Sequence, residues 1–363
     1  MRVYFYHTQD LNFIDREWRK GQFPGHLLYG ATHLGKEGVE VVMHQFIDGT
    51  KPRWRRALRN AWRILTNKEH FDAIYGTRHN GIEIIIMLRA LGLYRKPIVC
   101  WHHQPLEKSR SRIKEMIARL FYRGIDYLVF FSEKLRNESL ASGRITTSKT
   151  GVCPWGADLD YYDRLMRQNP CDRHEGFIST GKELRDMPTL INAFASQPDQ
   201  HLDIISTATC CGVDYEGVFQ SVEIPRNVSV IIERGKRILV NDLAHAIWPH
   251  KAICICCKKT NYTVGLTTLV EALAFGLPVI VSRNPNFPFD VQEAGCGISV
   301  PYGDVDGWKE AIHSIASDPS RAEKMGMKAR ELAESTYNVA NCAHYVAEVI
   351  KEVLGSKSRV SGQ

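Results

Sequence analysis

Short apolar runs alternate with stretches of helical character, and this alternation occurs twice along the 363-residue chain. In the first half the apolar runs are residues 3–6, 39–43, 73–75, 98–101 and 127–131. In the second half they are residues 176–179, 202–206, 228–232, 252–256 and 278–282. Runs this apolar are typical of parallel strands covered on both faces by helices. Two such halves, each long enough to bury its own core, predict an α/β protein of two doubly wound domains.

The segment 151–158 between the halves contains a proline, two glycines and an aspartate, residue types that favour irregular backbone. We therefore place the first domain over residues 1–155 and the second over residues 156–338. The polar tail 355–363 is expected to be frayed. Ligands of doubly wound sheets bind where strands lead into helix N-termini. The site is thus expected in strand-to-helix loops of both domains, facing each other across a cleft.

The most informative segment, residues 261–280, has the features of a phosphate-binding loop followed by a helix. Gly265 permits a sharp turn, and the backbone then passes through Leu266 to Thr267 and Thr268, whose amides and hydroxyls mark a helix start. That end of a helix carries the positive dipole and suits a phosphate. Glu271 lies one turn further on, where its carboxylate can accept hydrogen bonds from both hydroxyls of a ribose.

This segment resembles the nucleotide-sugar signature of retaining GT-B glycosyltransferases of the family-four, or glycosyl transferases group 1, type. Glu271 and the sequence Gly-Leu-Pro-Val at 276–279 match its second half, whereas Thr263 replaces its first glutamate. The resemblance implies a GT-B fold of two Rossmann-like domains, with the acceptor bound by the first domain and the donor by the second. It also implies that the final helix, residues 339–354, packs back on the first domain.

A second segment of the same half, residues 179–190, resembles the family's diphosphate-binding loop. Gly181 would allow close approach of the ligand, and Lys182 and Arg185 are the candidate cations. Arginine can hold phosphate oxygens in a bidentate manner, so its presence at the family's lysine position is chemically acceptable. A solvated loop is the alternative interpretation for either cation.

In the first half the resemblance rests on fewer residues. Gly25 stands where the family has a glycine-rich loop before its first helix, so it is a candidate nucleotide-sugar-binding residue that could allow the donor phosphate or the acceptor to approach closely. The alternative is a plain turn. His102 and His103 follow an apolar run where the family has a histidine that faces the sugar. A histidine there can donate to a sugar hydroxyl or stabilise developing charge, and the alternative is a hydrogen-bonded core histidine.

The positive charge of the chain is concentrated in its first part. Residues 1–160 hold 26 Lys and Arg against 16 Asp and Glu, whereas the remainder holds 21 against 24. Two basic stretches, residues 51–63 and 108–123, combine these cations with apolar residues and, in the first, with tryptophan. Such helices can lie on an anionic membrane or be solvated helices of a soluble domain. No motif of a nucleic-acid-binding class is present, so we expect no nucleic acid.

The chain has ten cysteines, and its first residues resemble a strand rather than an export signal. We therefore expect reduced thiols and a cytoplasmic protein, peripheral at the inner face of the membrane if the basic stretches bind lipid. Cys254, Cys256 and Cys257 are interpreted as buried strand thiols, because no second cluster has zinc-ligand spacing.

Together these features predict a hexosyl-type glycosyltransferase that moves a sugar from a nucleoside-diphosphate sugar to a glycan or lipid-linked acceptor. Retention of configuration is implied by the resemblance. No cofactor or essential metal is expected, because protein cations and a helix end would neutralise the leaving group. A phosphorylase or epimerase of the same fold is one alternative. A non-catalytic subunit that binds a partner or membrane is another, and Thr263 favours it.

Overall fold

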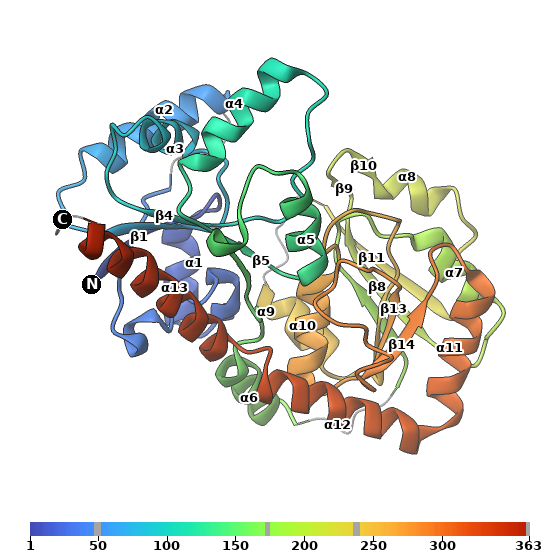
Figure 1. Ribbon diagram of the computed structural model, residues 1–363. Helices are drawn as coiled ribbons and strands as arrows, with labels where there is room; N and C mark the ends of the chain where they lie inside the picture. The colour runs from blue at the N-terminus through green and yellow to red at the C-terminus, as the bar shows by residue number, and fades with distance from the viewer. Residues whose placement is uncertain (47–51, 171–174, 235–239, 361–363) are drawn as a thin grey trace. The chain divides into compact units, whose positions relative to one another are not determined.

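The computed structural model describes residues 1–46, 52–170, 175–234 and 240–360, and of residues 356–360 it describes the backbone alone. The chain divides into two compact units, each built on a six-stranded sheet (Figure 1). The first unit comprises residues 1–21, 25–155 and 339–363, and the second comprises residues 22–24 and 156–338. Both are doubly wound, so the predicted α/β class with two Rossmann-like domains is confirmed.

The sheet of the first domain is entirely parallel, in the order β2-β1-β3-β4-β5-β6. Its central strands are buried along their whole length, which explains why they are apolar on both faces. The strands are β1 (Arg2–Tyr6), β2 (Glu40–Met43), β3 (Ala73–Gly76), β4 (Ile98–Trp101), β5 (Tyr127–Phe130) and β6 (Thr150–Val152).

Helices cover the first sheet, and most of those between strands begin at a side-chain cap. Ser111 caps α4 and Ser132 caps α5, each accepting a hydrogen bond from a first-turn amide. The α-helices are α1 (Leu11–Arg19), α2 (Arg53–Leu65), α3 (Glu83–Ala90), α4 (Arg112–Arg123), α5 (Glu133–Ala141) and α13 (Val339–Val360). Short 3-10 turns are η1 (Gly25–Leu28), η2 (Leu34–Glu37) and η3 (Thr147–Lys149).

The C-terminal helix α13 belongs to the first domain although it follows the second in sequence. Gly30 allows this packing, because a Cβ there would lie 3.0 Å from the Cα of Ala343, and its φ of +81° favours glycine. Cys153 lies beside Cys342, with 3.6 Å between their sulfur atoms, and both thiols are free and buried. The helix therefore contributes to the core of the first domain.

The second sheet is also parallel, in the order β11-β8-β7-β12-β13-β14, and a separate two-stranded hairpin pairs β9 with β10. Its core includes Phe177, Ile191, Trp308 and Ile312. The strands are β7 (Phe177–Thr180), β8 (Leu202–Thr207), β9 (Thr209–Cys210), β10 (Val213–Asp214), β11 (Val228–Glu233), β12 (Ala252–Ile255), β13 (Val279–Ser282) and β14 (Gly297–Val300).

Aspartates cap several helices of the second domain. Asp158 accepts from the amide of Tyr161 at the start of α6, and Asp304 accepts from Gly307 at the start of α11. Both aspartates therefore have a structural role as helix caps. The helices are α6 (Leu159–Gln168), α7 (Met187–Ala195), α8 (Tyr215–Gln220), α9 (Val240–Ile247), α10 (Leu266–Phe275), α11 (Val305–Ser317) and α12 (Pro319–Ser335).

The structure corrects two sequence predictions. The segment 151–158 is not irregular throughout, because its first residues complete the edge strand β6. The final helix does not end at Leu354: α13 continues to Val360, so residues 355–360 are helical rather than frayed. Extending an existing helix needs no new nucleus, so a polar sequence can continue it. Residues 361–363 and Lys51, at the start of the first basic stretch, lie outside the described residues.

Nowhere in the described ranges is there a helix with the length and apolar character needed to cross a membrane.

Candidate nucleotide-sugar site

The loop between β12 and α10 opens the N-terminus of α10 at the carboxyl edge of the second sheet. Gly265 precedes the helix with a φ of +93°, and a Cβ there would lie 2.6 Å from Cγ2 of Ile255. No side chain caps this helix, and Leu269 donates the first helical hydrogen bond, to the Gly265 carbonyl. The amides of Thr267 and Thr268 therefore lie in a first turn that has no helical acceptors for them.

Arg185 is the cation that the fold brings to this helix end, and its side chain is only 4% exposed. Its guanidinium donates through Nη2 to Oγ1 of Thr268 at 3.1 Å, and through Nη1 to the sulfur of Cys257 at 3.1 Å. Nε donates to the Thr180 carbonyl at 3.0 Å, at the end of β7. These contacts fix the guanidinium beside the first turn of α10.

No described carboxylate forms an ion pair with Arg185. A buried positive charge without a negative partner is costly, and it is stabilised when an anion binds next to it. The positive end of α10 adds to the same field. The arrangement of these two strand-to-helix loops of one domain therefore suits an anion, and we treat it as a candidate anion site.

The loop that carries Arg185 is tightly folded around the guanidinium. A Cβ on Gly181 would lie 2.2 Å from Nη2 of Arg185, and the φ of Gly181 is +105°. Leu184 also has a positive φ, of 46°, which is unusual for a leucine. The amide of Arg185 donates to the hydroxyl of Tyr215 at 2.9 Å, which fixes the loop from its other side. The second predicted cation, Lys182, is exposed on this loop.

Glu271 lies in the second turn of α10, three residues after Thr268, and is 5% exposed. Within the described part of the chain its carboxylate accepts no hydrogen bond. Burial raises the pKa of this carboxyl to about 8, and the positive charge of Arg185 opposes part of the rise. A buried acceptor of this kind is suited to a ligand that brings hydroxyl donors.

Thr263, which stands at the position of the family's first glutamate, is half-buried in the loop before α10. Its carbonyl accepts from the amide of Leu266, so it shapes the turn into the helix. The loop is supported from the next strand by Asn284, whose side chain donates to the Tyr262 carbonyl. The position therefore has a structural role in the loop, and its threonine side chain carries no charge.

In the first domain, His102 and His103 follow β4 at the carboxyl edge of the sheet, and burial lowers their pKa values to about 4 and about 3. The ring nitrogens of His102 contact the Gln104 carbonyl at 2.5 Å and the Tyr122 hydroxyl at 3.2 Å. His103 is less buried, and its Nε2 contacts the Thr77 carbonyl at 2.8 Å. Both rings are therefore neutral at physiological pH.

The sequence analysis missed three side chains at this edge, His7, Arg78 and His79. Arg78 follows β3, is exposed, and lies 3.3 Å from Nδ1 of His103. Its charge also lowers the pKa of His7, which burial places at about 4. His79 stacks on His102, with 5.3 Å between ring centroids. The sequence does show that each of the three follows a predicted apolar run. The order of the strands in the sheet then brings them together.

Gly25 is the first residue of η1 and is buried. Its φ is not in the left-handed region, so the backbone here does not require glycine. The neighbouring His26 is fully buried, and its carbonyl accepts from the indole of Trp155 at 3.0 Å. The turn thus packs into the core of the first domain.

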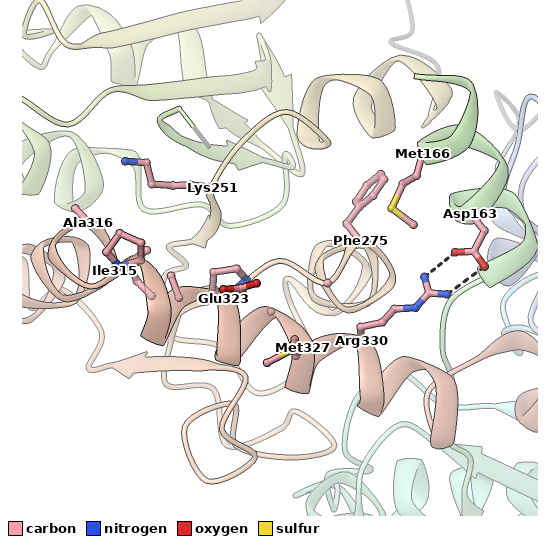
Figure 2. Close-up of a pocket in the computed structure, with 14 residues that line it drawn as sticks. Asp163, Met166, Lys251, Phe275, Ile315, Ala316, Glu323, Met327 and Arg330 are labelled. Carbon is pink, nitrogen blue, oxygen red and sulfur yellow. Dashed lines mark hydrogen bonds and ion pairs between the residues drawn. The ribbon is translucent and has the colours of Figure 1, made fainter. Parts of the chain in front are cut away.

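A cavity of about 780 Å³ lies at the opposite edge of the second sheet (Figure 2). Lys251 and Pro278, which line it, immediately precede β12 and β13, so the cavity is at the amino ends of these parallel strands. Arg330 on α12 closes one side: it pairs with Asp163 at 2.8 Å and donates to the last-turn carbonyl of Ala274 in α10 at 2.7 Å. These contacts join three helices, so Arg330 has a structural role in this region.

We expect Arg330→Met to lower the free energy of unfolding by about 1–3 kcal/mol, because it leaves Asp163 and the end of α10 without their donor. The measurement is urea unfolding. Lys328→Met is the matched control in the same helix, since its pair with Glu331 is exposed and should contribute less than about 0.5 kcal/mol. Equal effects of the two changes would contradict this role of Arg330.

Residues 249–332, which include β12 and α10, match the family model described as glycosyl transferases group 1. The chain is 24% identical over 188 residues to a D-inositol 3-phosphate glycosyltransferase of Corynebacterium kroppenstedtii. It is 34% identical over 112 residues to the protein of that name from Kribbella flavida. The matches cover 49% and 28% of this chain and span 40% and 26% of the two relatives.

Solved structures match nearly the whole chain. Sucrose-phosphate synthase of Thermosynechococcus elongatus has a TM-score of 0.70 at 14% identity, with 98% of this chain and 100% of that chain covered. Anabaena Alr3699/HepE, solved in complex with UDP, has a TM-score of 0.65 at 13% identity over 97% of this chain and 100% of its own. The GT-B fold and the resemblance to the group 1 glycosyltransferases are therefore confirmed.

Proposed function

We propose, from a chain with the GT-B fold and a group 1 match over residues 249–332, that this protein transfers a sugar from a nucleoside-diphosphate sugar to an acceptor. The observation that supports this most strongly is the buried guanidinium of Arg185, which has no ion pair among the described residues, beside the uncapped N-terminus of α10. One neighbour in fold, Anabaena Alr3699/HepE, was solved with UDP and with UDP-glucose.

The second domain would bind the donor. Arg185, the exposed Lys182 and the first-turn amides of α10 would hold the diphosphate, which gains negative charge as the glycosidic bond breaks. Gly181 and the backbone of residues 265–268 would allow the phosphates to approach. Glu271 would accept hydrogen bonds from the ribose hydroxyls. Because these groups already supply positive potential, we propose that transfer requires no metal ion.

The first domain would bind the acceptor, and His102 and His103 remain the proposed contacts of the sugar hydroxyls. Arg78, beside His103, joins them as a candidate. By resemblance to the family we propose that a hexosyl group is transferred with retention. The proposed acceptor is a glycan or a lipid-linked sugar, and the proposed location is the cytoplasm, at the inner face of a membrane.

The test is thermal melting of the full chain against UDP, GDP, ADP and their glucose derivatives. A nucleotide present at ~100 times its dissociation constant should add ~2.7 kcal/mol of stability. We then expect release of the nucleoside diphosphate from the donor only when an acceptor sugar is added. No shift with any nucleotide would support the non-catalytic subunit instead. Nucleotide binding with sugar conversion but without release would support an epimerase.

A further inference from the structure

Exposed apolar side chains are concentrated on one helical layer of the first domain. The described chain has thirteen large hydrophobic side chains that are more than a third exposed, and nine of them lie on α2, on α4 or just after α3. Helix α3 packs against both α2 and α4, so the three form one layer (Figure 1). We call its outer surface the docking face, made of Trp54, Leu58, Trp62, Leu65, Leu91, Leu93, Ile113, Met116 and Ile117.

On α2 the exposed side chains form a continuous stripe. Trp54 and Trp62 are 60% and 69% exposed, and Leu58 and Leu65 complete the stripe at intervals of three and four residues. The adjoining side of the helix, which includes Ala57 and Ile64, is buried. Helix α2 therefore has two apolar sides, and only one of them is needed to pack the domain.

Helix α4 also has an exposed apolar side. Ile113, Met116 and Ile117 are exposed on one side of the helix. Met116 and Ile117 also line a shallow groove of about 590 Å³, whose other lining residues include the acid Glu115 and five cations: Lys108, Arg110, Arg112, Arg119 and Arg123. The apolar stripe and the cations thus lie next to each other, as on α2, where Arg55 stacks on Trp54 at 5.1 Å.

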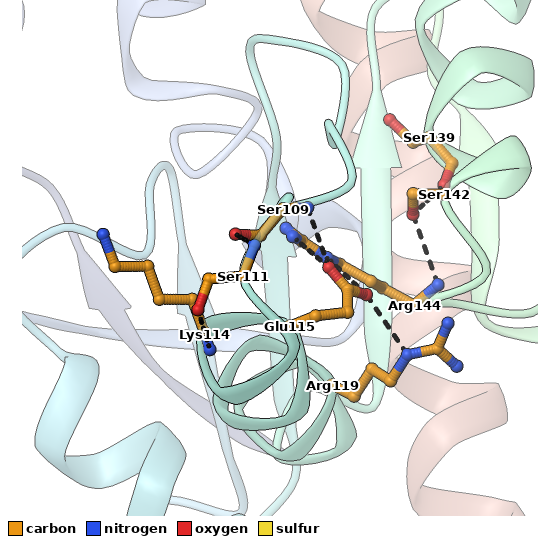
Figure 3. Close-up of polar contacts among 8 residues, drawn as sticks. All are labelled: Ser109, Ser111, Lys114, Glu115, Arg119, Ser139, Ser142 and Arg144. Carbon is orange, nitrogen blue, oxygen red and sulfur yellow. Dashed lines mark hydrogen bonds and ion pairs between the residues drawn. The ribbon is translucent and has the colours of Figure 1, made fainter.

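Few acids neutralise these cations. Glu83 pairs with Arg53, and Glu115 pairs with Arg119. Glu115 is already engaged by Arg144 at 2.7 Å and by the amide of Ser109 at 2.9 Å (Figure 3). Among the described residues, several cations of this layer have no ion pair: Arg55, Lys108, Arg110, Arg112, Lys114 and Arg123. The surface therefore combines exposed apolar side chains with unneutralised positive charge.

We propose that the docking face binds an anionic phospholipid bilayer. Its aromatic and aliphatic side chains would enter the boundary between headgroups and acyl chains, and the basic groove would contact lipid phosphates. Helices that bind at a membrane surface typically carry tryptophan and leucine next to arginine. A polyanion such as RNA would use the cations but leave the apolar stripes without a role. This inference rests on the proposed function, because binding to the bilayer would bring the protein to an acceptor that is held in the membrane.

The experiment is sedimentation of the full chain with vesicles of phosphatidylcholine alone or of phosphatidylcholine mixed with phosphatidylglycerol, without donor or acceptor. We expect binding to the anionic vesicles only, with a blue shift of tryptophan emission, because the other described tryptophans are largely covered. Trp54→Ser with Trp62→Ser should weaken binding by more than about tenfold and remove the blue shift. Arg112→Glu with Lys114→Glu should weaken it by about tenfold or more and reduce its salt dependence.

Matched controls come from the second domain, where Met327→Ser removes an exposed apolar side chain and Lys324→Glu reverses an exposed charge. Neither should change vesicle binding. Equal binding to neutral vesicles, or no binding to either kind, would overturn the proposal even if nucleotides still stabilise the protein. A dimer in solution that the tryptophan changes dissociate would also overturn it, because the face would then be an interface between copies.

Discussion

Arg185→Met is expected to abolish the rise in melting temperature that nucleotides produce and to lower kcat/KM for sugar transfer by about a hundred- to a thousandfold. The reason is that the guanidinium is the buried charge next to the proposed diphosphate site, and its Nη2 is already fixed on Thr268. Methionine fills a similar volume but supplies neither charge nor donors. The measurements are thermal melting with and without nucleotide, and initial rates of nucleoside-diphosphate release.

The free energy of unfolding of Arg185→Met without ligand shows whether Arg185 serves binding or stability. Loss of the hydrogen bonds to Thr180 and Cys257 destabilises the fold, but removing an unpaired buried charge offsets that loss. We therefore expect the free energy of unfolding without ligand to change by no more than about 1 kcal/mol. Arg330→Met should show the opposite pattern, with lower stability and a normal nucleotide response, because Arg330 has its acidic partners in the fold.

A nucleotide response that survives in Arg185→Met would show that the diphosphate is held elsewhere. A large loss of stability without ligand would show instead that Arg185 is mainly structural. Arg185→Lys keeps the charge but not the planar set of donors, so it should retain part of the nucleotide response. Lys182→Ala should have a smaller effect than Arg185→Met, since Lys182 is exposed and strongly solvated.

Most of the architecture could be predicted from the sequence, because a strand buried on both faces has a distinctive apolar sequence. Strands β1, β4, β7 and β12 all coincide with predicted apolar runs to within a residue or two. The edge strands β6 and β14 were not recognised as strands, since each is short and contains a glycine. Their register comes from the neighbouring strand rather than from their own sequence.

The candidate site, too, could be predicted from the sequence only in part. The loop before α10 could be predicted because its glycine, its threonines and Glu271 lie close together in the sequence. The contact between Arg185 and Thr268 joins two loops far apart in the sequence, so spacing alone could not show that Arg185 is buried and Lys182 exposed. Arg78 was missed for a related reason: only the order of β3 and β4 in the sheet brings it to His103.

The stability of the ligand-free protein should fall as the pH rises from about 4.5 to about 8, in part because of Glu271. Its pKa is raised in the folded state, so between these values the unfolded chain loses a proton that the folded chain keeps. Below pH 4.5 both states are protonated, and above pH 8 both are ionised. The full difference is on the order of a few kcal/mol. Glu271→Gln, which cannot ionise, should remove this component and be more stable than the wild type at pH 8.

Nucleotide binding should cause the carboxyl group of Glu271 to lose its proton. Ribose hydroxyls donate hydrogen bonds and favour the ionised carboxylate, and so does the Arg185 charge once the ligand excludes water. Binding at pH 7 should therefore release a proton, which calorimetry in two buffers of different ionisation enthalpy measures directly. In Glu271→Gln the proton release should disappear, and nucleotide affinity should fall by about ten- to a hundredfold. Unchanged affinity in this variant, with normal pH dependence of unfolding, would place the ribose away from α10 and leave Glu271 as a buried acid without a ligand.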